Sequence, residues 1–114
     1  MINSVVLVGR LVGDPELKEV GKDGKVVNFT LAVPRSYKNA EGEYDADFIN
    51  CNVWNVIAEN MSKFTHKGDV IGIEGSIQTS TFDDKDGNKR YKTEVRCEKV
   101  TFLSTKKADE KDGE

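Results

Sequence analysis

Residues 46–54 read ADFINCNVW, and side chains of two kinds alternate along this stretch. In an extended strand, successive side chains point to opposite faces of the sheet. One row is apolar and must cover a core, so the other row must face outward. The inner row is Ile49, Cys51 and Val53, and the outer row is Phe48, Asn50, Asn52 and Trp54.

The segments around this strand predict a small all-β domain. Apolar spacing after Trp54 favours a short helix through Ile57, Ala58, Met61 and Phe64, with Asn55 as its N-cap and Gly68 just past its end. Five strands with one short helix between strands 3 and 4 is the order of the five-stranded oligonucleotide-binding (OB) barrel. The expected strands are Ser4–Val12, Val26–Val33, Ala46–Trp54, Val70–Phe82 and Arg90–Leu103.

The connections are predicted from turn residues and glycines. Pro15–Lys25 is expected to be a polar connection and Ser36–Asp45 a long hairpin loop. Asp86-Gly87 is a hairpin signal. Bends, bulges or strand ends are expected at Pro34, at Gly72 and Gly75, and near Glu98-Lys99.

Composition narrows the class of protein. The 114 residues suit one domain at residues 1–104, followed by a charged, disordered tail at 105–114. The longest aliphatic run, Val5–Val8, is too short to span a membrane, and no secretory signal precedes it, so we expect a cytoplasmic protein. The net charge of −3 gives no basic excess, so nucleic-acid binding would depend on how the charges are distributed over the fold.

Chemistry-bearing residues are sparse. Cys51 and Cys97 lack the spacing of a metal site, so we expect two packed, reduced thiols. His66 is the only histidine and has no partner cluster in the sequence. We therefore expect no enzyme, no metal and no cofactor.

The aromatic residues divide into two groups. Phe29, Phe64 and Phe102 lie in apolar stripes and are expected in the core. Exposing a large ring forfeits roughly 1.5–3 kcal/mol of burial, whereas stacking a base on it contributes about 1–3 kcal/mol. A subunit interface or cross-strand ring pairs would also explain exposed rings. The rings expected outside the core are Tyr37, Phe48, Trp54 and Phe82.

Phosphate binding would also need cations beside these rings. The candidates come from the first strand, the two long hairpins and the end of the helix: Arg10, Arg35, Lys38, Lys67, Lys89, Arg90 and Lys92.

Several stretches together resemble the homotetrameric single-stranded DNA-binding proteins of bacteria and phages. They are MINSVVLVGRL, GDPEL, NFTLAV, DADFINCNVW, AEN, HKGDVIGIEG, IQT, YKTEV and VTFL, and the resemblance covers about residues 1–103. It implies base stacking on Tyr37, Phe48, Trp54 and Phe82, and a homotetramer around which the DNA strand wraps. It further implies phosphate contacts from Arg10, Arg35, Lys38, Lys67 and Arg90. Asn50 and Asn52 share the outer row with Phe48 and Trp54, so we expect them to add polar contacts on the same face.

This chain departs from the family pattern in three places near the expected site. Asn55 and Val56 stand where basic residues are common, Ser80 stands where arginine is usual, and Pro34 replaces a polar residue. Fewer cations predict weaker binding with a shallower salt dependence. The sequence also lacks the family's long linker and acidic Asp-Ile-Pro-Phe tip, so recruitment of repair or replication proteins through such a tip is not expected.

The function expected from the sequence is sequence-independent binding and protection of single-stranded DNA during replication, recombination or repair. The alternative, from a different class, is an OB-fold adaptor that binds protein through the aromatic face, in the manner of a primosome component.

Overall fold

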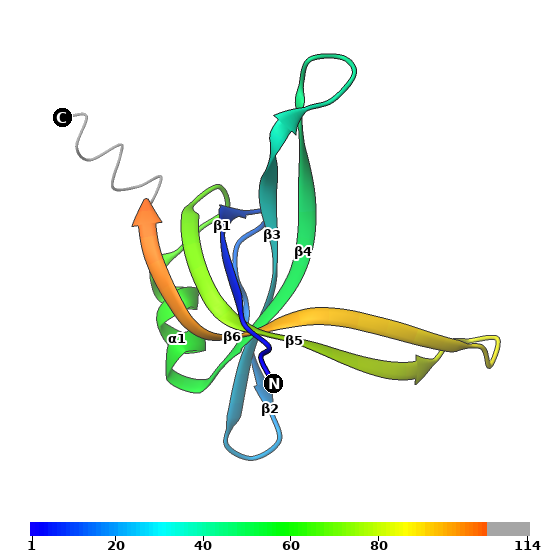
Figure 1. Ribbon diagram of the computed structural model, residues 1–114. Helices are drawn as coiled ribbons and strands as arrows, with labels where there is room; N and C mark the ends of the chain where they lie inside the picture. The colour runs from blue at the N-terminus through cyan, green and yellow to red at the C-terminus, as the bar shows by residue number, and fades with distance from the viewer. Residues whose placement is uncertain (105–114) are drawn as a thin grey trace.

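The computed structural model describes residues 1–104, and the predicted tail at 105–114 lies outside the described residues. These residues form six strands and one helix, whose arrangement is drawn in Figure 1. The helix lies between β4 and β5, where the sequence predicts it. The elements are β1 (Val5–Leu11), β2 (Leu17–Val20), β3 (Gly24–Lys38), β4 (Tyr44–Trp54), α1 (Asn55–Phe64), β5 (Val70–Asp83) and β6 (Lys89–Ser104).

Five of the strands close into a barrel. The sheet order is β1-β5-β6-β4-β3-β2, and an additional pairing of β1 with β3 completes the ring. Strand β2 pairs only with β3, so it lies outside the ring. β4 and β6 pair in parallel, whereas the other neighbours are antiparallel. The predicted OB barrel is therefore confirmed.

The barrel core is made of the inward-facing apolar rows that the alternation predicts, together with residues of the helix. Cys51 and Val53 are buried from β4, and Ala58 and Met61 cover one end of the barrel from α1. Cys51 and Cys97 are both buried and unbridged, as expected, and contact between the two thiols together with burial raises the pKa of Cys97. The core residues are Leu11, Val27, Phe29, Leu31, Cys51, Val53, Ala58, Met61, Ile71, Ile73, Val95 and Cys97.

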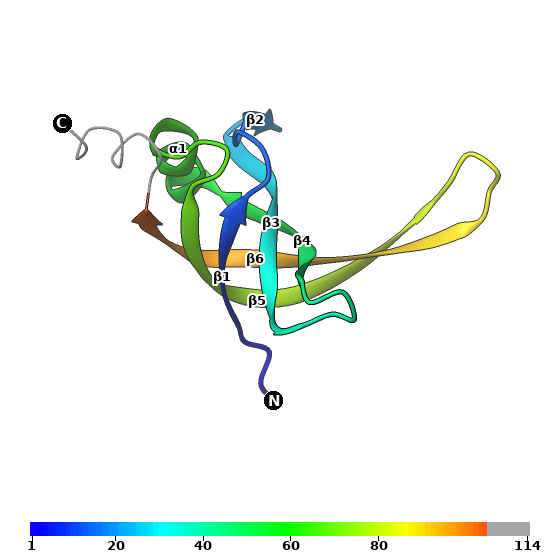
Figure 2. The same cartoon turned by 90° about the horizontal axis from the view of Figure 1, so that it is seen from above.

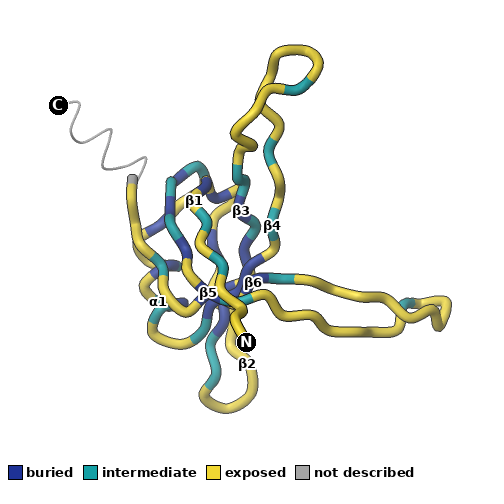
Figure 3. The backbone as a smooth tube through the Cα atoms, viewed as in Figure 1, coloured by how far each residue is buried: buried dark blue, intermediate teal, exposed yellow. Residues whose placement is uncertain are grey.

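Two hairpins extend beyond the barrel as arms. The outer parts of β3 and β4 form one arm and those of β5 and β6 form the other (Figures 1 and 2). Both arms are mostly exposed along their length (Figure 3). This explains one incorrect expectation: Ile77 continues the apolar row of β5, but it lies where the arm leaves the barrel and is exposed.

The glycine bend in β5 has a steric cause. The register of β5 against β6 shifts between Glu74 and Gly75, so Glu98 is the unpaired extra residue, as predicted. A Cβ on Gly75 would lie 2.0 Å from the carbonyl oxygen of Arg96, so only glycine lets the strands approach this closely. The register also shifts between Pro34 and Lys38, as the proline predicts.

The helix start differs from the prediction. Trp54, not Asn55, occupies the N-cap position, and no side chain caps the helix. Asn55 is the first helical residue, with a φ of 57°, a left-handed conformation that asparagine tolerates better than most residues. Its Oδ1 instead accepts a hydrogen bond from the backbone N–H of Lys25 at 3.4 Å, which ties the helix to β3.

Three further expectations were wrong. Phe64 and Phe102 are 58% and 39% exposed, because neither has an element packed over it. Pro15–Lys25 contains β2, whose residues are all exposed and carry no alternating apolar signal. Tyr37 belongs to β3 rather than to a loop, since that strand continues to Lys38. Across residues 1–104, no helix has the length and apolar character needed to cross a membrane.

Candidate nucleic-acid interface

A ladder across three strands brings a cation beside an exposed ring. Arg10 of β1 pairs with Ala32 of β3, and Ala32 pairs with Phe48 of β4. Paired residues point to the same side of a sheet, so Arg10 and Phe48 flank the small side chain of Ala32. Phe48 is 68% exposed. We call this side of the barrel and arms the outer face.

Trp54 is held at the other end of the same row. Its indole Nε1 donates to Oδ1 of Asn52 at 3.0 Å, and Asn52 is buried. The guanidinium of Arg96 lies over the ring, 5.6 Å from its centroid. Trp54 is only partly exposed. Asn52 thus orients the indole, whereas Asn50 is exposed on the outer face.

The outer face continues onto the β5–β6 arm. Asn52 pairs with Arg96, and Arg96 pairs with Ser76 of β5. Alternation from Ser76 places Phe82 on the same face, opposite Arg90, and Phe82 is 52% exposed. The Nε of Arg90 donates to Oδ2 of Asp84 at 2.8 Å. Phe48 and Phe82 therefore present rings from different arms.

The β3–β4 arm carries two exposed tyrosines near its tip. Tyr37 lies in the irregular stretch after Pro34. The Lys38 ammonium lies 5.8 Å from the ring centroid of Tyr44. Sequence reasoning did not select Tyr44, although it lies in the same predicted loop as Tyr37.

Arg35 forms an ion pair with Asp47. Its Nε and Nη2 both donate to the carboxylate of Asp47, at 3.2 and 2.8 Å. Asp47 pairs with Val33, on the side of the sheet opposite Phe48. The ion pair lowers the pKa of the Asp47 carboxyl and raises that of Arg35. In this geometry the Arg35 charge is compensated and does not face the outer side.

Lys67 is brought to the end of β1 by a network of loop contacts. Its backbone N–H donates to Oδ1 of Asp14 at 2.7 Å, and Gly68 N–H donates to the carbonyl of Leu11 at 2.9 Å. The Nη1 of Arg10 donates to the Gly68 carbonyl at 3.0 Å. Arg10 and Lys67, separate in sequence, thus lie at the same corner of the barrel.

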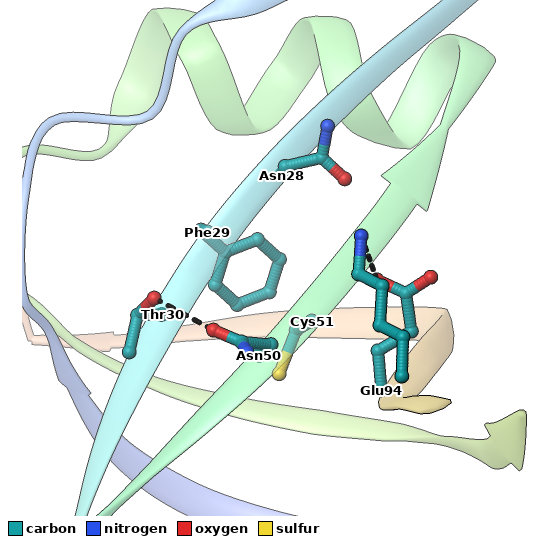
Figure 4. Close-up of a pocket in the computed structure, with 7 residues that line it drawn as sticks. Asn28, Phe29, Thr30, Asn50, Cys51 and Glu94 are labelled. Atoms are coloured by element: carbon teal, nitrogen blue, oxygen red, sulfur yellow. Dashed lines mark hydrogen bonds and ion pairs between the residues drawn. The ribbon is translucent and has the colours of Figure 1, made fainter. Parts of the chain in front are cut away.

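A recess of about 260 Å³ opens on the outer face between β3, β4 and β6 (Figure 4). Thr30 Oγ1 donates to Asn50 Oδ1 at 3.2 Å on one side. Lys92 Nζ and Glu94 Oε2 are 3.6 Å apart on the other side. We call this recess the fork, because β4 and β6 separate there. Its lining residues are Asn28, Phe29, Thr30, Asn50, Cys51, Lys92 and Glu94.

Sequence reasoning missed Arg96, Asn28, Thr30 and Glu94. A local signal existed for β6, because Glu94 and Arg96 alternate with the apolar residues Val95 and Cys97. That alternation shows that they face outward. It does not show that β6 lies beside β4, which only the parallel pairing reveals.

A closed five-strand barrel whose outer face carries rings and cations defines the class of OB-fold nucleic-acid-binding proteins. Comparison with known proteins makes this specific. Residues 2–103 match the single-strand binding protein family, and the chain belongs to that family. Membership of this family favours the binding of single strands over the adaptor alternative.

Individual single-stranded DNA-binding proteins of bacteria are similar to this chain over most of its length. The chain is 50% identical over 107 residues to single-stranded DNA-binding protein 1 of Lactococcus lactis, covering 94% of this chain and 71% of the relative. It is 46% identical over 113 residues to the single-stranded DNA-binding protein of Halalkalibacterium halodurans, covering 99% and 67%. Single-stranded DNA-binding protein A of Bacillus subtilis is 46% identical over 106 residues, covering 93% and 62%. The chain thus spans about two thirds of the length of these relatives.

Proposed function

We propose that this protein coats single-stranded DNA by stacking bases on the rings of its outer face. The stacking residues are Tyr37, Phe48, Trp54 and Phe82. The observation that carries the proposal is the exposure of Phe48 and Phe82 on one continuous face that also holds Trp54. Because every base has a π-face, such stacking tolerates most sequences.

Cations at the edges of this face screen the phosphates. Arg10 is the best supported, because it shares a cross-strand row with Phe48. Lys67 lies at the same corner, and Lys38 and Arg90 lie on the two arms. Arg35 contributes only when its ion pair with Asp47 opens. Of the two predicted amides, Asn50 faces the DNA, whereas Asn52 acts through the Trp54 indole.

We further propose that the protein acts in the cytoplasm as a homotetramer, the assembly typical of its family, and protects transient single strands during replication, recombination or repair. Exposed Val6 and Val8 on β1 offer an apolar surface for contact between copies. Light scattering of the purified protein tests the assembly, and a monomer at micromolar concentration would contradict it.

The stacking mechanism is tested by replacing rings and measuring binding of fluorescein-labelled oligo-dT by anisotropy. Trp54→Ala and Phe48→Ala should each weaken binding by about 1–3 kcal/mol. Phe48→Ala is the safer variant for folding, because Phe48 is the more exposed ring. Phe64→Ala is the matched control, since that exposed ring lies at the end of α1. Equal affinity of Phe48→Ala and the wild type would refute the stacking assignment.

A further inference from the structure

The fork lies on the path between the two arms. β4 and β6 are bridged at Cys51 with Val95 and at Asn52 with Arg96. Beyond these bridges the strands separate, β4 toward Phe48 and β6 toward Arg90 opposite Phe82 (Figure 1). A DNA strand that stacks on both Phe48 and Phe82 must cross the opening between the arms.

The walls of the fork carry hydrogen-bonding groups (Figure 4). Asn50 Oδ1 accepts from Thr30. Among residues 1–104, neither Asn50 Nδ2 nor the Asn28 amide group has a side-chain partner. The β3–β4 wall therefore offers amide donors to a ligand.

The opposite wall offers an acceptor. The Glu94 side chain is 21% exposed, and that of Lys92 is 49% exposed. Glu94 thus lies deeper in the fork, while Lys92 extends toward solvent. A carboxylate repels phosphate but accepts hydrogen bonds from an amino group. The chemistry of the fork therefore suits the edge of a base, with the ammonium of Lys92 near the phosphate of the same nucleotide.

Donor and acceptor patterns distinguish the pyrimidines. Cytosine presents an amino group at C4 beside the acceptor N3, and carboxylates accept from that amino group. Thymine and uracil present a carbonyl oxygen at C4 and an N–H at position 3. Against Glu94 the C4 carbonyl would place one acceptor against another. The Asn50 amide matches the cytosine N3 acceptor.

We propose that the fork is a base-edge site that, among pyrimidines, prefers cytosine at one position per chain, with Glu94 accepting from its amino group and Asn50 Nδ2 donating to its ring nitrogen. This site rests on the proposed single-stranded DNA binding and adds a base preference to it. Stacking on the rings stays tolerant of sequence, and the preference comes from this one position.

The test compares labelled oligo-dC with oligo-dU at pH 7.5, because these pyrimidines lack the methyl group of thymine. The wild-type chain should bind oligo-dC about fivefold or more tightly. Glu94→Gln should reduce the difference, because its amide can also donate to the uracil C4 oxygen, while the contact of Asn50 with the ring nitrogen remains. Glu98→Gln, a neutralisation at the unpaired bulge residue of the same strand, should preserve the difference. Thermal unfolding of both variants checks that the barrel is intact.

Equal affinity of the wild type for the two oligomers would overturn the fork assignment, and so would a preference that Glu94→Gln leaves undiminished. Oligo-dT binding that Phe48→Ala weakens would leave the stacking proposal standing in either case. Absence of any oligonucleotide binding by the wild type would overturn both proposals.

Discussion

The guanidinium carbon of Arg96 in β6 lies 5.6 Å from the centroid of the Trp54 ring in β4. Asn52, which pairs with Arg96 in the parallel ladder of β4 and β6, accepts a hydrogen bond from the indole N–H of the same ring. The ring is therefore held from its edge by an amide and from its face by a cation. Two strands that are distant in sequence together position one of the proposed stacking residues.

Replacing Arg96 tests the importance of this arrangement. Arg96→Ala removes a cation–π contact of about 0.5–1 kcal/mol and a positive charge beside the DNA. Affinity for oligo-dT should fall, and the slope of log K against log salt should become shallower by about 0.7. Titration at several salt concentrations measures both effects. Arg96→Lys should retain the slope, and a shallower slope for that variant as well would contradict the assignment.

The Arg35–Asp47 pair should restrain DNA binding. Asp47→Asn removes the carboxylate to which Arg35 donates and frees the guanidinium for phosphate. We expect tighter binding of oligo-dT and a salt slope steeper by about 0.7. Asp45→Asn, on the same arm, controls for the general loss of a negative charge. If the two variants behave alike, Arg35 is not a DNA contact.

The β5–β6 hairpin should weaken in acid through Asp84. Its carboxylate accepts from the backbone N–H groups of Asn88 and Asp86 and from Arg90, and these contacts lower its pKa below the usual value. The folded-state pKa of Asp84 lies below the unfolded value of about 3.9. The stabilisation of the folded hairpin by this carboxylate is therefore complete at pH values above about 3.9. It is lost as the pH falls through the folded-state pKa.

Carboxyl-carbon NMR titration measures the Asp84 pKa directly. Hydrogen exchange of the Asn88 amide should accelerate in Asp84→Asn at neutral pH, because the neutral amide is a weaker acceptor. An unshifted Asp84 titration would show that the loop contacts do not persist in solution.

Gly75 should be intolerant of any side chain. Gly75→Ala would place a Cβ 2.0 Å from the Arg96 carbonyl oxygen, which must shift β6 or break the bulge. Overpacking of this kind costs about 1–3 kcal/mol, measurable by urea unfolding. Gly13→Ala is the matched control, because no atom lies within 4 Å of its Cβ position. Similar unfolding midpoints for the two variants would contradict the steric argument.

Much of the fold could be predicted from local patterns. The alternation in 46–54 correctly separates buried Cys51 and Val53 from exposed Phe48. Pro34 and Gly75 predicted two of the register shifts, because these residues mark places where a regular ladder cannot continue, whereas the shift between Val70 and Ile71 was not predicted. β2 was missed because its side chains are all exposed, so no buried apolar row marks it in the sequence.

The candidate site could be predicted only in part. Periodicity shows that Phe64 and Phe102 belong to apolar stripes, but it does not show whether another element covers them. Local sequence also does not show whether a charged side chain is paired with another charge. Nothing local distinguishes Arg35, which is paired with Asp47, from Arg10, which shares a row with Phe48.

The sequence by itself determined which side chains of the barrel strands face inward, because a strand has a period of two and one apolar row must be buried. Only the tertiary structure decided which outward residues lie together. The parallel contact of β4 with β6 and the closure of β1 onto β3 join residues far apart in the chain. Such long-range pairing leaves no periodic trace in the sequence, so the Trp54–Arg96 contact and the fork emerge only when the barrel closes.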